Sequence, residues 1–263
     1  MRQFPQSQLL STLQANGELN AGHVDEMAQQ IAHFHTQAPQ VPAAHYQGTP
    51  EAVMDPVRQN FEQIRPFLSD KADLLQLEAL QAWAEASFTR LKPLFEQRKA
   101  QGFIRECHGD IHLGNATMID GKVVIFDCIE FNEDFRWIDV ASELAFTYMD
   151  LLDHRRPDLA AWLLDAWLHE SGDFSAVPVL RFYSVYKALV RAKVADLPLS
   201  FAFDDTMALP GGQKISDLPA ITVEARVAKS GQAQSASGDL FGSVPGVKPG
   251  SQGIKVVIDQ VQP

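Results

Sequence analysis

The stretch HGDIHLGN at 108–115 constrains the fold of this chain more than any other part of the sequence. Gly109 and Gly114 interrupt it and argue against a helix, because glycine in a helix interior costs about 1 kcal/mol relative to alanine. Glycine instead permits the unusual backbone angles of a sharp turn. We therefore predict that this stretch is a loop that carries acidic, amide and imidazole side chains.

Two short apolar segments follow the loop, at 116–119 and 122–127. Between them stands the dipeptide Asp120-Gly121, which is typical of a two-residue β-hairpin turn. The sequence therefore predicts a hairpin directly after the loop. Asp127 closes its second strand, so a further carboxylate is expected beside the loop.

These side chains have the spacing and chemistry of a phosphoryl-transfer site. Asp110 and Asn115 are five positions apart, as are the aspartate and asparagine of the kinase catalytic loop H-R-D-x-x-x-x-N. Magnesium beside the γ-phosphate of ATP needs hard oxygen ligands, which Asn115 and Asp127 offer. A second carboxylate must accept a hydrogen bond from the acceptor hydroxyl, and Asp110 fits that role. We expect His108 and His112 to complete the catalytic motif by fixing the loop with hydrogen bonds.

Two other interpretations of the loop stay open. Asp, Gly and His are ordinary loop residues, so the string also fits a turn without catalytic function. His108 and His112 are four positions apart, as in the zinc motif H-E-x-x-H, although that motif requires a helix. For Asp127 alone, an exposed acid at a strand end is a sufficient explanation, and only its pairing with Asn115 favours a metal site.

The stretch matches the motif H-G-D-x-H-x-x-N, and by this motif the chain resembles the aminoglycoside phosphotransferase family, whose fold is protein-kinase-like. Residues 1–194, particularly FDCIEFNEDFRWIDVASELAF at 126–146, are most similar to the phosphotransferase half of bacterial bifunctional aminoglycoside phosphotransferase and ATP-binding proteins. The resemblance implies that ATP and Mg²⁺ take part and that a small-molecule hydroxyl is the acceptor.

The resemblance also implies roles for individual residues. Asp110 is expected to be the catalytic base, and Asn115 and Asp127 the magnesium ligands. Asp139 is expected to brace the catalytic loop from a helix. The first three roles agree with those argued above from oxygen chemistry.

A kinase-like enzyme also needs a lobe of strands, with a Gly-rich flap over the phosphates and a lysine on its third strand. Residues 1–107 contain no G-x-G-x-x-G and no V-A-I-K-like strand, and the chain has no Walker A string. We therefore expect a C-lobe that lacks its N-lobe. Nucleotide binding is then expected to be weak and turnover negligible unless another chain completes the cleft.

Apolar residues recur at helical spacing in three segments of the first part of the chain. The stripes are Val24, Met27, Ile31 and Phe34 after an Asn20 N-cap; Leu77, Leu80, Ala84, Phe88, Leu91 and Phe95, in a helix that Pro93 kinks; and Leu159, Trp162, Leu163, Ala166 and Trp167. Further helices are predicted at 138–150 and 178–194, and a strand at 103–107. The predicted class is α+β: a mainly helical protein-kinase-like C-lobe whose small β-hairpin carries the catalytic loop, then a small all-β C-terminal unit.

Charge narrows the choice of partner. The net charge of −11 and the pI near 5.1 argue against nucleic acid or an anionic membrane surface as the main partner. A cationic small-molecule acceptor is favoured instead. An acidic rim beside the site is expected from Glu130, Glu133, Asp134, Asp150 and Asp153. A merely solvated acidic surface explains the same residues equally well.

No apolar run is long enough to span a membrane, and Met1 to Asn20 lacks the basic and apolar regions of a signal peptide. The expected compartment is the cytoplasm. Cys107 and Cys128 are the only cysteines. We interpret them as small buried residues beside the loop, because they lack the C-x-x-C spacing of a redox motif. A disulfide between them stays open as an alternative that no motif in the sequence supports.

Composition changes after Val194, where Gly, Pro and Ser become frequent. Residues 221–227 alternate between apolar and polar side chains, as in a half-buried strand, and 253–261 suit another strand. The segment 231–251 is turn-rich and suits a loop or short edge strands. We predict a domain boundary at 194, with a small β domain at 195–263.

The tail DLPLSFAFDDTMALPGGQKISDLPAITVEARVAKSGQAQSASGDLFG at 196–242 resembles the C-terminal domain of the bacterial c-type cytochrome biogenesis protein that presents apocytochrome to the haem ligation machinery. In its family that domain is periplasmic and is anchored through membrane helices. The resemblance implies apocytochrome c as a partner. It places the two halves of the chain on opposite sides of a membrane.

Three functional hypotheses follow. The first is an ATP-dependent phosphotransferase acting on a small-molecule hydroxyl, impaired by the missing lobe. The second is a cytochrome c biogenesis module, in which the tail binds apocytochrome and the kinase-like part is a passenger. The third is a nonfunctional fusion, joined within residues 193–197, and under this hypothesis the chain is not an active enzyme.

Overall fold

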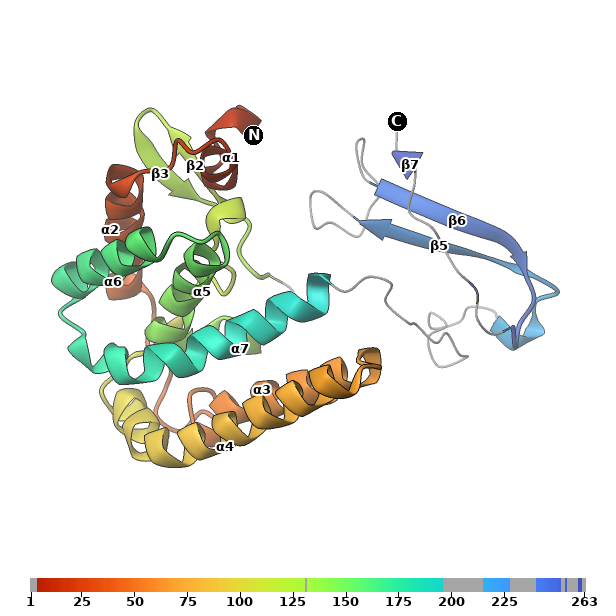
Figure 1. The fold of residues 1–263 in the computed structure, drawn as a ribbon, viewed down its shortest axis with the longest axis horizontal. Coiled ribbons are helices and arrows are strands. Elements are labelled where there is room, and N and C mark those ends of the chain that lie inside the picture. The colour runs from red at the N-terminus through yellow and green to blue at the C-terminus, as the bar shows by residue number, and fades with distance from the viewer. Residues whose placement is uncertain are drawn as a thin grey trace. The chain divides into compact units, whose positions relative to one another are not determined.

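A computed structural model describes residues 4–130, 132–195, 215–227, 240–251, 254 and 260–261. The chain divides into two compact units, residues 1–197 and 198–263. The first unit is mainly helical with small antiparallel sheets, and the described part of the second is β-structure (Figure 1). This mixed composition agrees with the predicted α+β class.

Helices make up most of the first unit. They are α1 (Leu10–Ala15), α2 (Ala21–Gln37), α3 (Pro50–Ile64), α4 (Lys71–Ala100), α5 (Val140–Asp153), α6 (Pro157–Ser171) and α7 (Val177–Ala195). Polar side chains begin several of them: the Asn20 side chain accepts hydrogen bonds from the backbone N–H groups of Gly22 and His23, which confirms the predicted N-cap of α2. Asp139 caps α5 in the same way.

Helix α5 is the centre of this unit. It lies between α6 and α7, and α3 and α4 pack along the other side of α7 (Figure 1). All residues of α5 from Val140 to Thr147 are buried, as expected for a helix that is covered on every side. Two residues of the predicted stripes are wrongly placed, because Phe34 is 40% exposed and Trp162 is 51% exposed.

Two small antiparallel sheets hold the loop. Strands β2 (Ala116–Ile119) and β3 (Lys122–Ile125) form the predicted hairpin, and β1 (Ile104–Glu106) pairs with β4 (Trp137–Asp139). Asp120 and Gly121 have φ values of 51° and 78°, as a two-residue type I′ turn requires. The hairpin is therefore confirmed, although β3 ends two residues before Asp127. The pairing of β1 with β4 was not predicted.

The second unit contains a three-stranded antiparallel sheet in the order β5 (Ile221–Val227), β6 (Leu240–Val247) and β7 (Gln260–Val261). Strand β5 coincides with the predicted strand at 221–227. The segment at 231–251 contains β6, which lies in the middle of the described sheet rather than at its edge. Residues 253 and 255–259 of the other predicted strand lie outside the described residues. Within the described part of the chain, no helix combines the length and hydrophobicity needed to cross a membrane.

Candidate active site

The HGDIHLGN stretch forms an irregular loop between β1 and β2, and only Leu113–Asn115 make a short 3₁₀ turn. His108 Nε2 lies 3.0 Å from the Phe126 carbonyl, and its Nδ1 accepts a hydrogen bond from the Asp110 N–H at 3.3 Å. His112 Nδ1 accepts from the Gly114 N–H at 3.0 Å. Both histidines therefore fix the loop as expected. The zinc interpretation is wrong, because there is no helix and both nitrogens of His108 are occupied.

Asp110 and Asn115 are in direct contact. The Asn115 Nδ2 donates to the Asp110 carbonyl and to its Oδ2, each at 3.0 Å. Asn115 is buried, whereas the Asp110 side chain is 36% exposed. Burial by itself raises the pKa of Asp110, but the nearby His112 and the charge of Lys187 lower it below its ordinary value overall. Asp110 is thus an ionised carboxylate that is oriented by Asn115 and open to solvent.

Asp127 lies where the hairpin leads back to the loop. The Phe126 N–H donates to the Asn115 carbonyl at 3.0 Å, so Asp127 follows directly after the residue that pairs with Asn115. Asp127 has φ of 65°, a conformation that is uncommon outside glycine and that is found at functional sites. It is exposed, and among the described residues its carboxylate makes no hydrogen bond or ion pair. The end of the loop at Asn115 and the end of the hairpin at Phe126 are therefore adjacent, and Asp127 directly follows them.

Helix α5 holds the loop from below. Glu143 Oε1 accepts from the Gly109 N–H at 2.6 Å, Thr147 Oγ1 donates to the Ile111 carbonyl at 2.8 Å, and Asp150 Oδ2 accepts from the Leu113 N–H at 2.8 Å. The three side chains are spaced by four and three residues, so they share one face of the helix. Sequence reasoning missed Glu143 and Thr147. The sequence feature that could have identified them is the spacing of polar residues on one face of a mainly apolar helix.

The hydrogen bonds of Asp139, which was predicted to brace the catalytic loop, join helices. Its carboxylate binds the guanidinium of Arg98 in two hydrogen bonds of 2.8 Å, caps α5 at the Ala141 N–H, and accepts from the Tyr183 hydroxyl at 3.2 Å. None of these bonds reaches the loop. The reason is its position at the N-cap, which turns the side chain over the first turn of α5. Arg98 also binds Asp173, so this buried network joins helices rather than the catalytic loop.

The acidic rim is smaller than predicted. Asp150 is only 2% exposed and forms an ion pair with Arg191, so its assignment to the rim was wrong. Glu130, Glu133, Asp134 and Asp153 are exposed. The cysteine interpretation is half right, because Cys107 is buried and Cys128 is exposed, and neither forms a disulfide.

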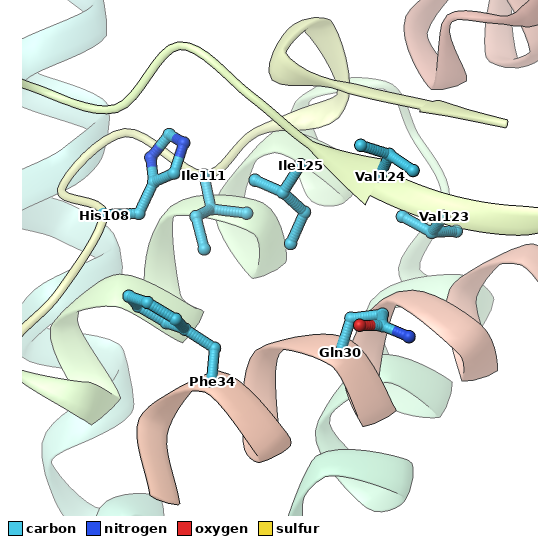
Figure 2. Close-up of a pocket in the computed structure, with 7 residues that line it drawn as sticks. All are labelled: Gln30, Phe34, His108, Ile111, Val123, Val124 and Ile125. Atoms are coloured by element: carbon cyan, nitrogen blue, oxygen red, sulfur yellow. The ribbon is translucent and has the colours of Figure 1, made fainter. Parts of the chain in front are cut away.

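A hollow of about 340 Å³ lies between α2 and β3 (Figure 2). Its lining is largely aliphatic and aromatic: Gln30, Phe34, His108, Ile111, Val123, Val124 and Ile125. His108 and Ile111 connect it to the loop, but Asp110, Asn115 and Asp127 do not line it. The hollow therefore suits an apolar group and is separate from the oxygen-rich side of the loop.

Comparison with known proteins agrees with both resemblances. Residues 6–183 match the family model of the phosphotransferase enzyme family, and residues 187–259 match that of the cytochrome c-type biogenesis protein H Ig-like domain. Relatives include Uncharacterized protein Mb2027c of Mycobacterium bovis and Uncharacterized protein Rv2004c of Mycobacterium tuberculosis, each 28% identical over 194 residues.

The match to these relatives covers 74% of this chain but only 39% of each relative. The chain therefore spans less than half the length of the curated proteins it matches. The phosphotransferase match, in contrast, extends over most of the first unit and includes the loop, the hairpin and α5. Since it covers more than half of the chain, this protein belongs to the phosphotransferase enzyme family.

Proposed function

We propose that residues 1–194 form a protein-kinase-like C-lobe that transfers the γ-phosphoryl group of ATP to a hydroxyl of a small molecule. The observation that carries this proposal is the contact of Asn115 with Asp110 at the point where the hairpin delivers Asp127. It brings the backbone of Asp127 next to the turn that carries Asp110 and Asn115. An acid, an amide and a second acid are the groups that a kinase-type site uses.

Asn115 and Asp127 are proposed as magnesium ligands. The Asn115 N–H₂ group is engaged by Asp110, which leaves its Oδ1 without a hydrogen bond among the described residues. The carboxylate of Asp127 likewise has no hydrogen-bond or ion-pair partner among the residues that the structure describes. Two hard oxygens without partners fit Mg²⁺, which when bound neutralises charge on the phosphates.

Asp110 is proposed as the base that orients the acceptor hydroxyl. Its side chain is partly exposed and ionised, and Asn115 fixes its direction. His112 Nε2 lies 3.7 Å from the Asp110 Oδ2, and His108 holds the loop to the hairpin. The two histidines are thus proposed as residues that support the base.

The phosphates of ATP also need contacts on the side that faces away from the proposed magnesium ligands, which a Gly-rich flap supplies in kinases. Residues 4–100 consist of helices with short 3₁₀ turns and loops, and no strand there could carry a Gly-rich flap. We therefore propose that residues 1–263 alone bind nucleotide weakly. The net charge of −11 and the exposed Glu130, Glu133 and Asp134 support a cationic acceptor. Dependence on ATP supports a cytoplasmic site of action.

Binding of Mn²⁺, a paramagnetic substitute for Mg²⁺, tests this proposal by electron paramagnetic resonance with and without ATP. We expect Asp127→Asn to weaken Mn²⁺ binding roughly tenfold or more, as loss of a charged ligand predicts. Asp165→Asn changes an exposed acid on α6 and serves as the matched control. Absence of Mn²⁺ binding in the wild type, or equal binding in both variants, contradicts the proposed metal site. Formation of ADP with a panel of cationic hydroxyl compounds then tests the transfer.

A second function is proposed for residues 195–263, as a β domain that binds apocytochrome c. The match over 187–259 supports it, and in the described sheet β5 is paired on one side only, which leaves an edge where an extended peptide could add a strand. Fluorescence anisotropy with apocytochrome peptides tests it. We expect binding to the full chain and none to a chain that ends at Ala195. Equal binding by both chains eliminates this function, and loss of all binding together with intact Mn²⁺ binding leaves only the phosphotransferase.

A further inference from the structure

The backbone of Gly109, directly before Asp110, is held at its N–H and at its carbonyl by buried charged groups. Glu143 Oε1 accepts from its N–H at 2.6 Å, and Lys187 Nζ donates to its carbonyl at 3.4 Å. Glu143 is 1% and Lys187 6% exposed. Gly109 has φ of 90°, and a Cβ there would lie 2.8 Å from the Phe135 carbonyl. A side chain at this position would therefore displace its neighbours.

The other oxygen of Glu143 is bound by His35. His35 Nε2 lies 2.9 Å from Glu143 Oε2, and His35 Nδ1 lies 3.3 Å from the indole nitrogen of Trp167. An indole nitrogen can only donate, so Nδ1 must accept and therefore carries no proton. The proton of the neutral imidazole is consequently on Nε2 and points at Glu143. A continuous chain of hydrogen bonds thus runs from Trp167 on α6 to Gly109 in the loop.

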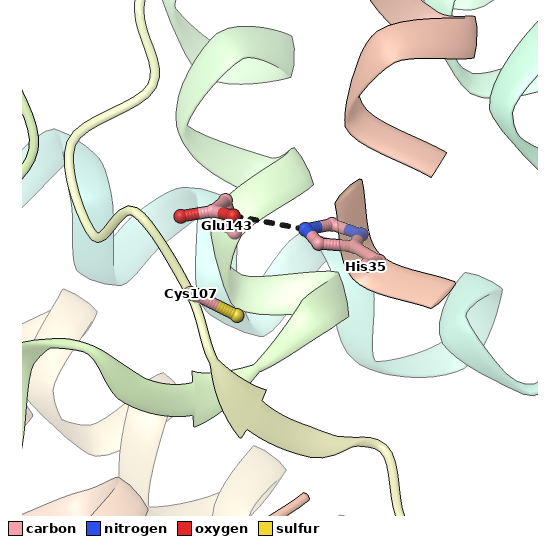
Figure 3. Close-up of side chains that lie close together, drawn as sticks. All are labelled: His35, Cys107 and Glu143. Carbon is pink, nitrogen blue, oxygen red and sulfur yellow. Dashed lines mark hydrogen bonds and ion pairs between the residues drawn. The ribbon is translucent and has the colours of Figure 1, made fainter. Parts of the chain in front are cut away.

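The same site superficially resembles a metal centre. Ligand atoms of His35, Cys107 and Glu143 lie within 4.8 Å of one another, and this donor set is one that zinc accepts (Figure 3). The hydrogen bonds argue against a metal, because the unprotonated nitrogen of His35 is turned to Trp167. The Cys107 thiol lies 3.6 Å from the Ile138 carbonyl, and burial raises its pKa well above the ordinary value. Hydrogen bonding therefore accounts for the cluster without a cation.

We propose that Trp167, His35, Glu143 and Lys187 are positioning residues that fix Gly109 and thereby aim Asp110 at the acceptor. We call them the Gly109 clamp. The functional part of this inference rests on the proposed role of Asp110. Lys187 also balances the charge of the clamp, since Glu143, Asp110 and Cys107 are the titratable groups that face it and the rings of Phe146 and Tyr186 lie 5.0 and 5.4 Å from its Nζ.

Nuclear magnetic resonance of the full chain tests the clamp without nucleotide or metal. Long-range proton–nitrogen correlation should show His35 protonated on Nε2 and not on Nδ1. The Trp167→Phe variant removes the indole donor together with part of a fully buried ring system, and we expect amide exchange at Gly109 to become roughly tenfold faster, as loss of support to a charged hydrogen bond predicts. Trp162→Phe, on the exposed face of the same helix, is the matched control and should leave Gly109 unchanged.

Glu143→Gln and Lys187→Met extend the test from either side of Gly109, and Lys187→Arg should restore slow exchange because it keeps the positive charge. Thermal unfolding of each variant verifies that it is folded. A proton on Nδ1 of His35, stoichiometric zinc in the purified protein, or unchanged Gly109 exchange in folded Trp167→Phe and Glu143→Gln proteins overturns the proposal.

In the assay for phosphoryl transfer, the clamp predicts a selective effect. Trp167→Phe should lower kcat severalfold while KM for Mg-ATP and the affinity for Mn²⁺ stay unchanged, because Asn115 and Asp127 are not altered. A rise in KM with constant kcat contradicts the positioning role. Loss of Mn²⁺ binding in the wild type instead refutes the proposed function, and leaves the hydrogen-bond test of the clamp independent of it.

Discussion

The two sides of the catalytic loop differ in a regular way. Gly109, Ile111 and Leu113 are buried and bound to α5, whereas Asp110 and His112 between them are partly exposed. Alternation of this kind is expected of an extended segment, in which successive side chains point to opposite faces. The inner residues hold the loop and the outer ones carry its polar chemistry. Substitutions on the two sides should therefore affect different properties.

The largest expected loss of stability comes from the buried network of Arg98, Asp139 and Asp173, which joins the helices that pack around the inner side of the loop. Arg98→Ala leaves the carboxylates of Asp139 and Asp173 buried without their partner, which should lower the free energy of unfolding by about 3–5 kcal/mol. Urea denaturation measures it. Arg90→Ala changes an exposed arginine on the same helix and should stay within about 0.5 kcal/mol of the wild type. Similar values for both variants would show that the network does not stabilise the packing of the helices.

Glu143→Gln should lower the free energy of unfolding by about 1–3 kcal/mol at neutral pH, because the amide cannot accept hydrogen bonds at both of its atoms. Burial by itself raises the pKa of Glu143, but the hydrogen bonds from His35 and Gly109 lower it overall below its ordinary 4.5. Its contribution is thus complete above the unfolded-state pKa and disappears as pH falls through the lower folded-state value.

The difference between wild type and Glu143→Gln should accordingly shrink in acid, below about pH 4.5. Denaturation curves at several pH values between neutral and acid measure it. Glu170→Gln, at an exposed position on α6, is the control and should show no such trend. A difference that grows in acid would mean that the folded protein does not favour the ionised carboxylate.

Thr147→Val removes the hydroxyl that donates to the Ile111 carbonyl and keeps the side-chain shape. We expect a loss of about 1 kcal/mol in urea denaturation, since a buried carbonyl loses its donor. Thr89→Val removes a comparable bond to the Glu85 carbonyl on the exposed surface of α4 and should have a smaller effect. Equal losses of unfolding free energy in the two variants would indicate that burial does not strengthen the hydrogen bond between Thr147 and the Ile111 carbonyl.

The smallest effect on stability is expected on the outer side. Asp127→Asn should change the free energy of unfolding by less than about 0.5 kcal/mol, because the side chain is exposed and asparagine tolerates a positive φ. The same variant should lose Mn²⁺ affinity, as described above. A folded variant with full affinity, or one that is strongly destabilised, would remove the distinction between the two sides.

Local chemistry made much of the fold predictable. The Asp120-Gly121 turn identified the hairpin, the Asn20 cap identified the start of α2, and helical periodicity located α4 and α7. The order of residues in the loop also indicated that Asp110 and Asn115 belong together. These features depend on neighbours in the sequence, so the chain itself contains the necessary information.

The rest depends on contacts between residues far apart in sequence. Asp139 and Asp150 have carboxylates, which are usually exposed, and their arginine partners on other helices help to explain why each is buried. His35 and Glu143 meet across 108 positions. No periodicity marks such a pair, because each residue alone looks like an ordinary polar residue of a helix.

The alternation of the loop makes its length as important as its composition. Deleting or inserting one residue between Gly109 and Leu113 would exchange the two faces: the carboxylate of Asp110 would turn towards α5 and an aliphatic side chain towards solvent. Relatives that retain this architecture should therefore differ in the residue types of this segment and not in its number of residues.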